Sequence, residues 1–139
     1  QLIERDALRR SIASGDLDWE GGVVSAHHKL ASIEERMTTE EPIDIRQWRK
    51  FDREFHTALI SATRSTFMLK LYNDIFDHFL RYQMIAMGFR GKPAAEEHLA
   101  IMRHALARRA PEAIAVLSDH IELGVQEAMA KGPLASSPE

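Results

Sequence analysis

The chain has 139 residues, 45% hydrophobic and 28% charged, which is enough for one globular domain with a substantial core. Its formal net charge of -3 argues against direct binding to nucleic acid, because domains that grip phosphate backbones carry a basic excess. The absence of cysteine excludes disulfides, thiolate metal ligands and cysteine nucleophiles, and it fits a reducing, cytoplasmic location.

Apolar residues recur with helical spacing along the whole chain, and no apolar run approaches the roughly 20 residues of a membrane helix. We expect six helices, at about 2–14, 18–38, 44–62, 65–88, 93–109 and 111–131. Connections this short predict an all-α antiparallel bundle over residues 1–131, followed by a flexible C-terminal tail over 132–139. Because the chain opens on Gln1 with no signal-like segment, we expect a fragment of a longer protein.

Each helix carries an apolar stripe that should face the core. The stripe of the first helix includes Leu2 and Leu8, and that of the second includes Trp19, Val23 and Val24. The stripe expected on the fourth helix consists of Phe67, Leu71, Ile75, Phe79 and Tyr82.

The third helix contains the stretch FDREFH, residues 51–56, which places polar groups on an apolar face. Asp52 and His56 are four residues apart and therefore lie one above the other, beside the core residue Phe55. A buried carboxylate costs several kcal/mol unless it is paired or bound to a metal. The pair therefore requires a partner inside the bundle.

Two further histidines lie on inward faces of other helices. His98 shares a face with Ile101, and His120 lies on the stripe that contains Leu117. Together with Asp52 and His56 they form a candidate ligand set of three imidazoles and one carboxylate for zinc, nickel, copper, iron or manganese. The alternative is that each is a hydrogen-bonded core histidine. The remaining histidines have weaker cases, with the 27–28 pair expected on a solvated flank: His27, His28, His78 and His104.

Two segments resemble a known family. FDREFHTALISAT at 51–63 and EEHLAIMRHALARRAPEAIAVLSDHIELG at 96–124 are similar to the FCD ligand-binding domain of FadR-type regulators in the GntR family, as are IERDALRRSI and DWEGGVVSAHHKL near the start. The resemblance implies an antiparallel bundle of six to seven helices. It also implies a divalent metal ion, zinc first and otherwise nickel or manganese, held by Asp52, His56, His98 and His120.

The same resemblance implies a regulatory function. In the family this domain follows an N-terminal winged helix-turn-helix that binds operator DNA, usually as a homodimer, and that domain is absent from this chain. A small carboxylate effector would complete the coordination of the metal, and an arginine would hold its other end. We expect this arginine to be Arg81, because it follows the apolar stripe of the fourth helix, with Tyr82 as a hydroxyl donor; the weaker candidates are Arg49, Arg53 and Arg103.

Two other functions are consistent with the same residues. A metal-dependent enzyme would also use three histidines, a carboxylate and an open position. However, no further carboxylate stands at an obvious spacing to act as a general base, since Glu97 points about 100° away from His98 around its helix. The other alternative is a helical interaction module with a structural metal. We expect a regulatory domain rather than an enzyme.

Overall fold

The computed structural model describes residues 2–39, 44–86 and 90–131, without the side chains of 76, 78–86, 128 and 131. In these ranges the chain forms six helices, which are α1 (Leu2–Ser14), α2 (Leu17–Thr38), α3 (Ile45–Ile60), α4 (Thr66–Ala86), α5 (Lys92–Leu106) and α6 (Ala110–Lys131). The all-α bundle expected from the apolar spacing is confirmed. The expected tail at 132–139 lies outside the described residues.

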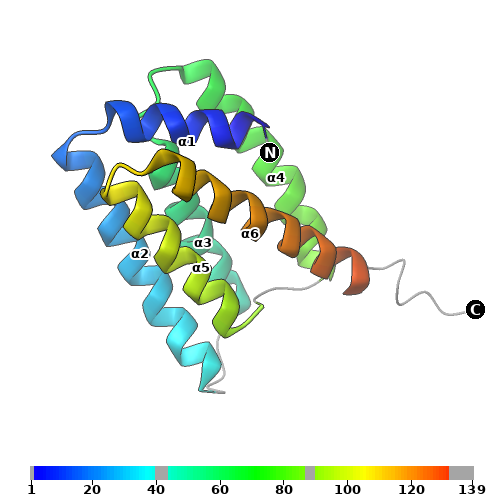
Figure 1. Ribbon diagram of the computed structural model, residues 1–139. Coiled ribbons are helices and arrows are strands. Elements are labelled where there is room, and N and C mark those ends of the chain that lie inside the picture. Colours follow the sequence, from blue (N-terminus) through cyan, green and yellow to red (C-terminus); the bar gives the residue numbers. More distant parts are fainter. Residues whose placement is uncertain (1, 40–43, 87–89, 132–139) are drawn as a thin grey trace, which may run out of the picture.

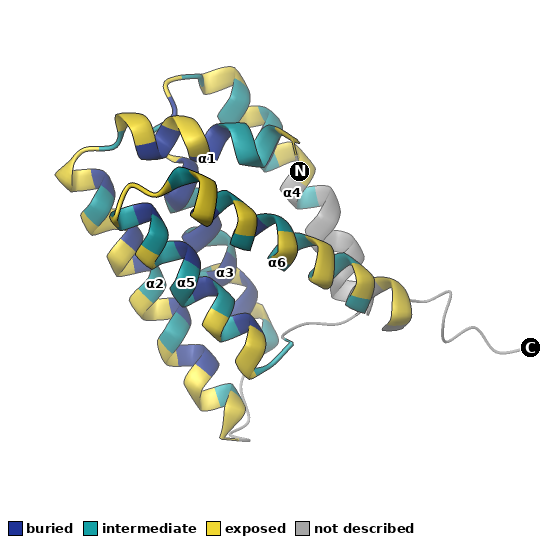
Figure 2. Ribbon diagram, in the orientation of Figure 1, coloured by how far each residue is buried: buried dark blue, intermediate teal, exposed yellow. Residues whose placement is uncertain are grey.

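The helices pack as an antiparallel bundle closed at one end (Figure 1). α2 runs antiparallel to α3 and α5 and contacts both, α6 packs on α5, and α1 crosses the end of the bundle in contact with α3, α4 and α6. The buried faces of α2, α3 and α5 turn toward one another (Figure 2). α3 is therefore the central helix, and the polar pair on its inner face lies deep in the molecule.

Short polar side chains set the helix starts. Asp16 accepts a hydrogen bond from the Trp19 backbone amide at 2.9 Å, and Asp44 accepts one from that of Arg46 at 3.0 Å. Both bonds satisfy amides that have no partner within their helix. At the start of α5, Gly91 has φ +83°, a conformation that favours glycine, and a proline follows in the first turn.

The core is continuous across the bundle. Its fully buried side chains include Phe55, Leu8, Leu30, Ile101 and Leu117, one from each of α3, α1, α2, α5 and α6. The buried indole of Trp19 donates from Nε1 to the Leu59 carbonyl oxygen at 3.2 Å, which satisfies the polar atom of a large core side chain.

Within the described side chains, four residues of the predicted apolar stripes are exposed instead of buried, namely Leu2, Val24, Phe67 and Ile75. The error on α4 has a physical reason: this helix is apolar on several sides, so spacing alone does not select its inner face. Its inner face carries buried Tyr72 and partly buried Met68 and Leu69. The stripe through Phe67 and Ile75, which led to Arg81, is therefore wrong.

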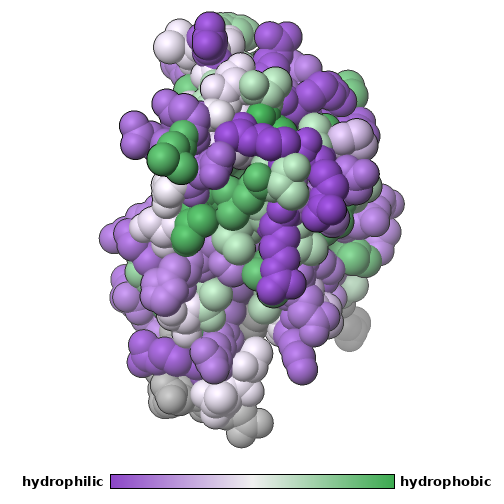
Figure 3. Space-filling view, turned by 60° about the vertical axis from the view of Figure 1, so that its left-hand side comes forward, coloured by the Kyte–Doolittle hydropathy of each residue, from purple (hydrophilic) through white to green (hydrophobic). Residues whose placement is uncertain are grey.

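An apolar groove lies on the outer side of α2. Exposed Leu17 and Val24 of α2 and Leu106 at the end of α5 line an open groove. A space-filling view from this side shows a small apolar patch among polar side chains (Figure 3). Across the described ranges, no helix combines the length and apolar character needed to cross a bilayer.

The turn between α1 and α2 yields the first prediction. A Cβ at Gly15 would lie 2.4 Å from the Trp19 ring and 2.8 Å from the Ser11 carbonyl oxygen. Gly15→Ala should therefore lower the free energy of unfolding by about 1–3 kcal/mol, the usual effect of forcing extra atoms into a packed site. Urea denaturation measures this change.

Gly21 is the matched control, because a Cβ there meets nothing within 4 Å on the exposed side of α2. Gly21→Ala should raise the free energy of unfolding by about 0.5–1 kcal/mol, since alanine is the better helix former. Equal effects of the two substitutions would contradict the packing described for Gly15.

Candidate metal centre

Three histidines from three helices meet in the middle of the bundle. His56 of α3, His98 of α5 and His120 of α6 each offer a ring nitrogen, and these nitrogens lie within 4.8 Å of one another. His56 and His98 are buried, and His120 is partly buried. Their ring centroids lie 4.6–5.5 Å apart.

Asp52 lies one helical turn before His56 and contacts two of the three rings. Its Oδ1 atom is 3.5 Å from Nε2 of His56 and 3.3 Å from Nε2 of His98. The structure thus brings together all four residues that the sequence predicted as ligands.

The four residues strongly perturb one another's protonation. Burial alone would raise the pKa of Asp52, but His56 and His98 outweigh it and hold this pKa well below its usual range. Burial likewise opposes protonation of His56, yet Asp52 raises its pKa to about 10. His98 behaves in the same way, with Asp52 and Glu34 raising its pKa.

His120 responds in the opposite direction. Burial and the neighbouring His98 and His56 lower its pKa to about 3. At neutral pH its imidazole is therefore neutral and carries a lone pair, as a metal ligand must.

The residues present fit a divalent cation. The buried Nε2 atom of His98 makes no aligned hydrogen bond, although Asp52 is nearby. A buried ring nitrogen without an aligned hydrogen bond is uncommon in a folded protein, and a bound cation would satisfy it. Imidazole nitrogens with one carboxylate oxygen are a ligand set that suits zinc, nickel and related ions.

A second set of carboxylates surrounds the histidines, and each contacts a different Nδ1 atom. Glu34 of α2 lies 3.1 Å from Nδ1 of His98, and Glu97 of α5 lies 2.7 Å from Nδ1 of His120. Glu4 of α1 lies 3.6 Å from Nδ1 of His56. The three carboxylates therefore approach the histidines on their Nδ1 sides and leave the Nε2 atoms free of these contacts.

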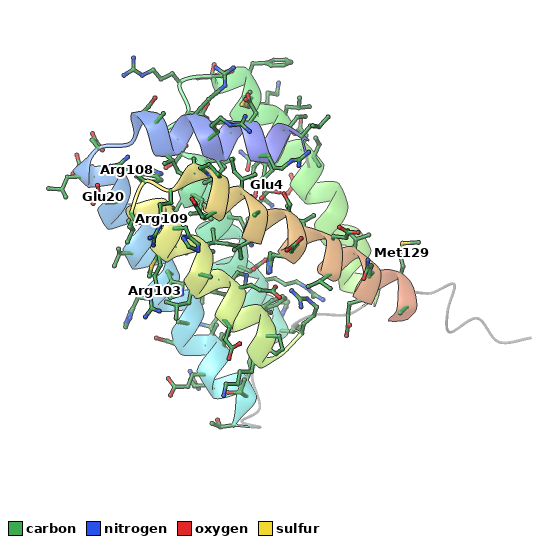
Figure 4. All side chains as sticks on the ribbon, viewed as in Figure 1. Glu4, Glu20, Arg103, Arg108, Arg109 and Met129 are labelled. Atoms are coloured by element: carbon green, nitrogen blue, oxygen red, sulfur yellow. The ribbon has the colours of Figure 1, made fainter. Side chains whose placement is uncertain are left out.

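These carboxylates are held in turn by other side chains. Glu34 accepts a hydrogen bond from Nε1 of Trp48 at 3.1 Å, and Glu4 accepts one from the Tyr72 hydroxyl at 3.3 Å. Figure 4 shows Glu4 near the start of α1, beside α4. Arg90, on the segment before α5, forms an ion pair with Glu97, and its Nη2 atom lies 3.3 Å from Nδ1 of His120.

Sequence reasoning missed all three outer carboxylates. Glu97 does point away from His98, as its spacing predicts, but it reaches His120 on the next helix. Glu34 and Glu4 come from helices far from their histidines in the sequence, so no local spacing marks them. The one available signal was that Glu34 directly follows Ile33, a residue of the inner stripe of α2.

A comparison of the sequence with known protein families identifies the family of this domain. Residues 1–123 match the sequence profile of the FCD domain. This chain belongs to the FCD domain family. The family resemblance inferred from the motifs is thereby confirmed.

Two curated relatives are similar to this FCD domain. An uncharacterized HTH-type transcriptional regulator, BphR of Paraburkholderia xenovorans (strain LB400), is 37% identical over 127 residues, which are 88% of this chain and 51% of that protein. The HTH-type transcriptional repressor GlaR of Escherichia coli (strain K12) is 29% identical over 83 residues, which are 60% of this chain and 37% of that protein. This chain thus spans about half the length, or less, of these relatives.

A solved structure shares the fold. It is a GntR family transcriptional regulator from Pseudomonas syringae pv. tomato str. DC3000, which superposes with a TM-score of 0.69 at 24% sequence identity. The match covers 91% of this chain and 50% of that one. At this identity the likeness supports the helical bundle of the FCD domain and nothing finer.

The other residues singled out from the sequence have different environments. The side chains of Arg81, Tyr82 and His78 lie outside the described residues. Arg49 is buried, and Arg53 of the FCD domain pairs with Asp77, whereas Arg103 is exposed (Figure 4).

Both histidines of the 27–28 pair were expected on a solvated flank, and this is correct for only one of them. His28 is exposed, but His27 is partly buried because its ring packs on that of Phe55, with 5.5 Å between the ring centroids. His104 is partly buried on α5.

Removing the central carboxylate should destabilise the metal-free FCD domain. Asp52→Ala leaves His56 and His98 buried without their shared counter-charge, so the free energy of unfolding should fall by about 3–5 kcal/mol. Urea denaturation in the presence of a chelator measures the loss. Asp119→Ala, at an exposed position of α6, is the control and should change stability by less than about 0.5 kcal/mol. A similar small effect at both positions would contradict the ion-pair network.

Proposed function

We propose that this domain is the effector-sensing, metal-binding regulatory domain of a cytoplasmic GntR-type transcription factor. The observation that supports it best is the convergence of His56, His98 and His120 beside Asp52 in a chain of the FCD family. The names of the relatives, which are HTH-type regulators, support a regulatory role over an enzymatic one. In the longer protein, operator DNA would be bound by a separate N-terminal domain, as a homodimer.

The metal would be held by Asp52, His56, His98 and His120, with zinc as the first expectation and nickel or manganese as alternatives. When bound, it supplies an open coordination position that attracts an anionic oxygen ligand. A small organic carboxylate is therefore the effector class that we propose. The protein's own contribution is to hold the four ligands in place and to keep the site inside the bundle.

An arginine near the site would bind the far end of the effector. Arg90 is the arginine whose described contacts favour this role, because its guanidinium lies beside His120 and pairs with Glu97. Its remaining N–H groups can donate to a second carboxylate. Arg81 stays a proposal from sequence, although the stripe that led to it is wrong.

The first test of the proposal is metal content. We expect about one divalent ion per chain by elemental analysis, and added metal at 100 times its Kd should stabilise the metal-free protein by about 2.7 kcal/mol. His56→Ala and His120→Ala should each abolish most of this gain, because each removes a ligand.

His28→Ala serves as the control, since His28 is exposed on α2. It should bind metal as the wild type does. A folded wild-type protein that gains no stability from zinc, nickel or manganese would rule out the metal centre.

The second test links effector to metal. Calorimetric titration with a panel of di- and hydroxycarboxylates should show binding to the metal-loaded protein and much weaker binding after chelation. In metal-saturated protein, Arg90→Ala should weaken this binding by about 1.5–3 kcal/mol, the value of a hydrogen bond to a charged group.

Arg103→Ala is the matched control, because Arg103 is exposed on α5. Arg81→Ala belongs in the same series, and a loss found there but not in Arg90→Ala would assign the role to α4. Unchanged effector affinity after complete metal removal would show that the metal is structural.

A further inference from the structure

Glu34 is the most deeply buried acidic side chain at the centre. It is 1% exposed, and it lies on α2, which supplies none of the four candidate ligands. A buried carboxylate of this kind is costly to desolvate, so it must form strong contacts. It contacts His98 and Trp48.

Both oxygens of Glu34 lie close to one ring nitrogen. The distances to Nδ1 of His98 are 3.1 Å from Oε2 and 3.3 Å from Oε1. A carboxylate is an acceptor only, so Nδ1 must carry the proton of a neutral His98 ring. The lone pair is then on Nε2, which faces Asp52.

The surroundings keep both partners from turning away. Trp48 donates from Nε1 to Oε2 of Glu34 at 3.1 Å, which fixes the carboxylate on the α2 side. Phe55, fully buried, packs edge-on against the His98 ring at a centroid distance of 5.5 Å and an interplanar angle of 75°. The ring orientation and its tautomer are therefore both set from outside the ligand set.

We propose that Glu34 is a positioning residue for the metal, which selects the tautomer of His98 that presents the Nε2 lone pair to the ion. This inference rests on the proposed metal centre and extends it by a fifth residue on a fourth helix. Outer carboxylates of this kind typically strengthen metal binding about 10- to 100-fold.

Glu34→Gln is the informative substitution, because it keeps the shape and removes one acceptor. A glutamine has one oxygen for two donors, the Nδ1–H of His98 and the Nε1–H of Trp48. If the amide oxygen serves Trp48, the NH2 group faces Nδ1 and favours a proton on Nε2. That tautomer cannot bind a metal through Nε2.

The experiment is a competition titration of Zn²⁺ or Ni²⁺ against a chromophoric chelator. Glu34→Gln should bind about 10- to 100-fold more weakly than the wild type. Glu35→Gln, the same change at the next, exposed position of α2, should bind within about twofold of the wild type. Nitrogen NMR of the metal-free proteins, at a pH where the His98 ring is neutral, should report the tautomer change in Glu34→Gln alone.

Two further variants separate positioning from a general loss of structure. In the His98→Ala background, Glu34→Gln should have no additional effect on metal affinity, because its target is gone. Trp48→Phe removes the donor that holds Glu34 and should also weaken binding, by less than Glu34→Gln. It provides the test if Glu34→Gln does not fold.

The outcomes distinguish the metal centre from the positioning role of Glu34. A folded wild-type protein that binds neither ion would overturn the metal centre, and the role of Glu34 with it. Wild-type metal binding with unchanged affinity in the folded Glu34 or Trp48 variants would overturn only the positioning role. Equal losses from Glu34→Gln with and without His98 would do the same.

Discussion

The structure depends on how one buried carboxylate is compensated. Asp52 lies on the inner face of the central helix, where an isolated charge would be strongly unfavourable. Its Oδ1 atom lies within 3.5 Å of His56 and His98, and these contacts extend outward to Glu4 and Glu34. The result is a chain of alternating acidic and imidazole groups that runs through the core from α1 to α2.

This row of contacting side chains contains more acidic groups than imidazoles. Formally, three carboxylates, Asp52, Glu34 and Glu4, alternate with two histidines, so two protonated imidazoles do not balance them. A divalent cation bound by the Nε2 atoms would displace one proton from each imidazole, so the formal charge would not change, but the positive charge would move from the rings to the centre. The same outer carboxylates that complete the ion pairs of the metal-free protein would then face neutral, metal-bound rings and keep their Nδ1 contacts.

The contacts among these histidines and carboxylates require the helical bundle, because the residues come from several helices. α3 supplies two residues, α5 and α6 supply one histidine each, and α1 and α2 supply the carboxylates of His56 and His98. Aromatic side chains fill the spaces between them, with Phe55 against both His56 and His98. The relative positions of these helices therefore determine whether the ring nitrogens converge.

Local patterns predicted the helices and the four inner residues because each of them is marked by spacing along one helix. Every helix boundary lies within about three residues of its expected position, and Asp52 and His56 were visible as a pair four residues apart. The outer carboxylates and the side chains that hold them could not be found in this way, because these partners are far apart in the sequence. Glu34 is 64 residues from His98, and Tyr72 is 68 residues from Glu4. On α4, apolar residues on several sides gave no unique inner face, and the expected stripe through Phe67 was wrong.

The affinity for a metal depends on the contacts that its ligands make with one another before it binds. Oδ1 of Asp52 contacts the Nε2 atoms of both His56 and His98 in the metal-free protein. A metal that takes these same atoms as ligands must first break their ion pairs and release protons, at a cost set by the raised pKa of His56, about 10. The stabilisation seen on adding metal is therefore the difference between two competing arrangements of the same residues. For this reason, an Asp52 substitution alters both arrangements at once, whereas Glu34 contacts only the outer side of His98, away from the shared atoms.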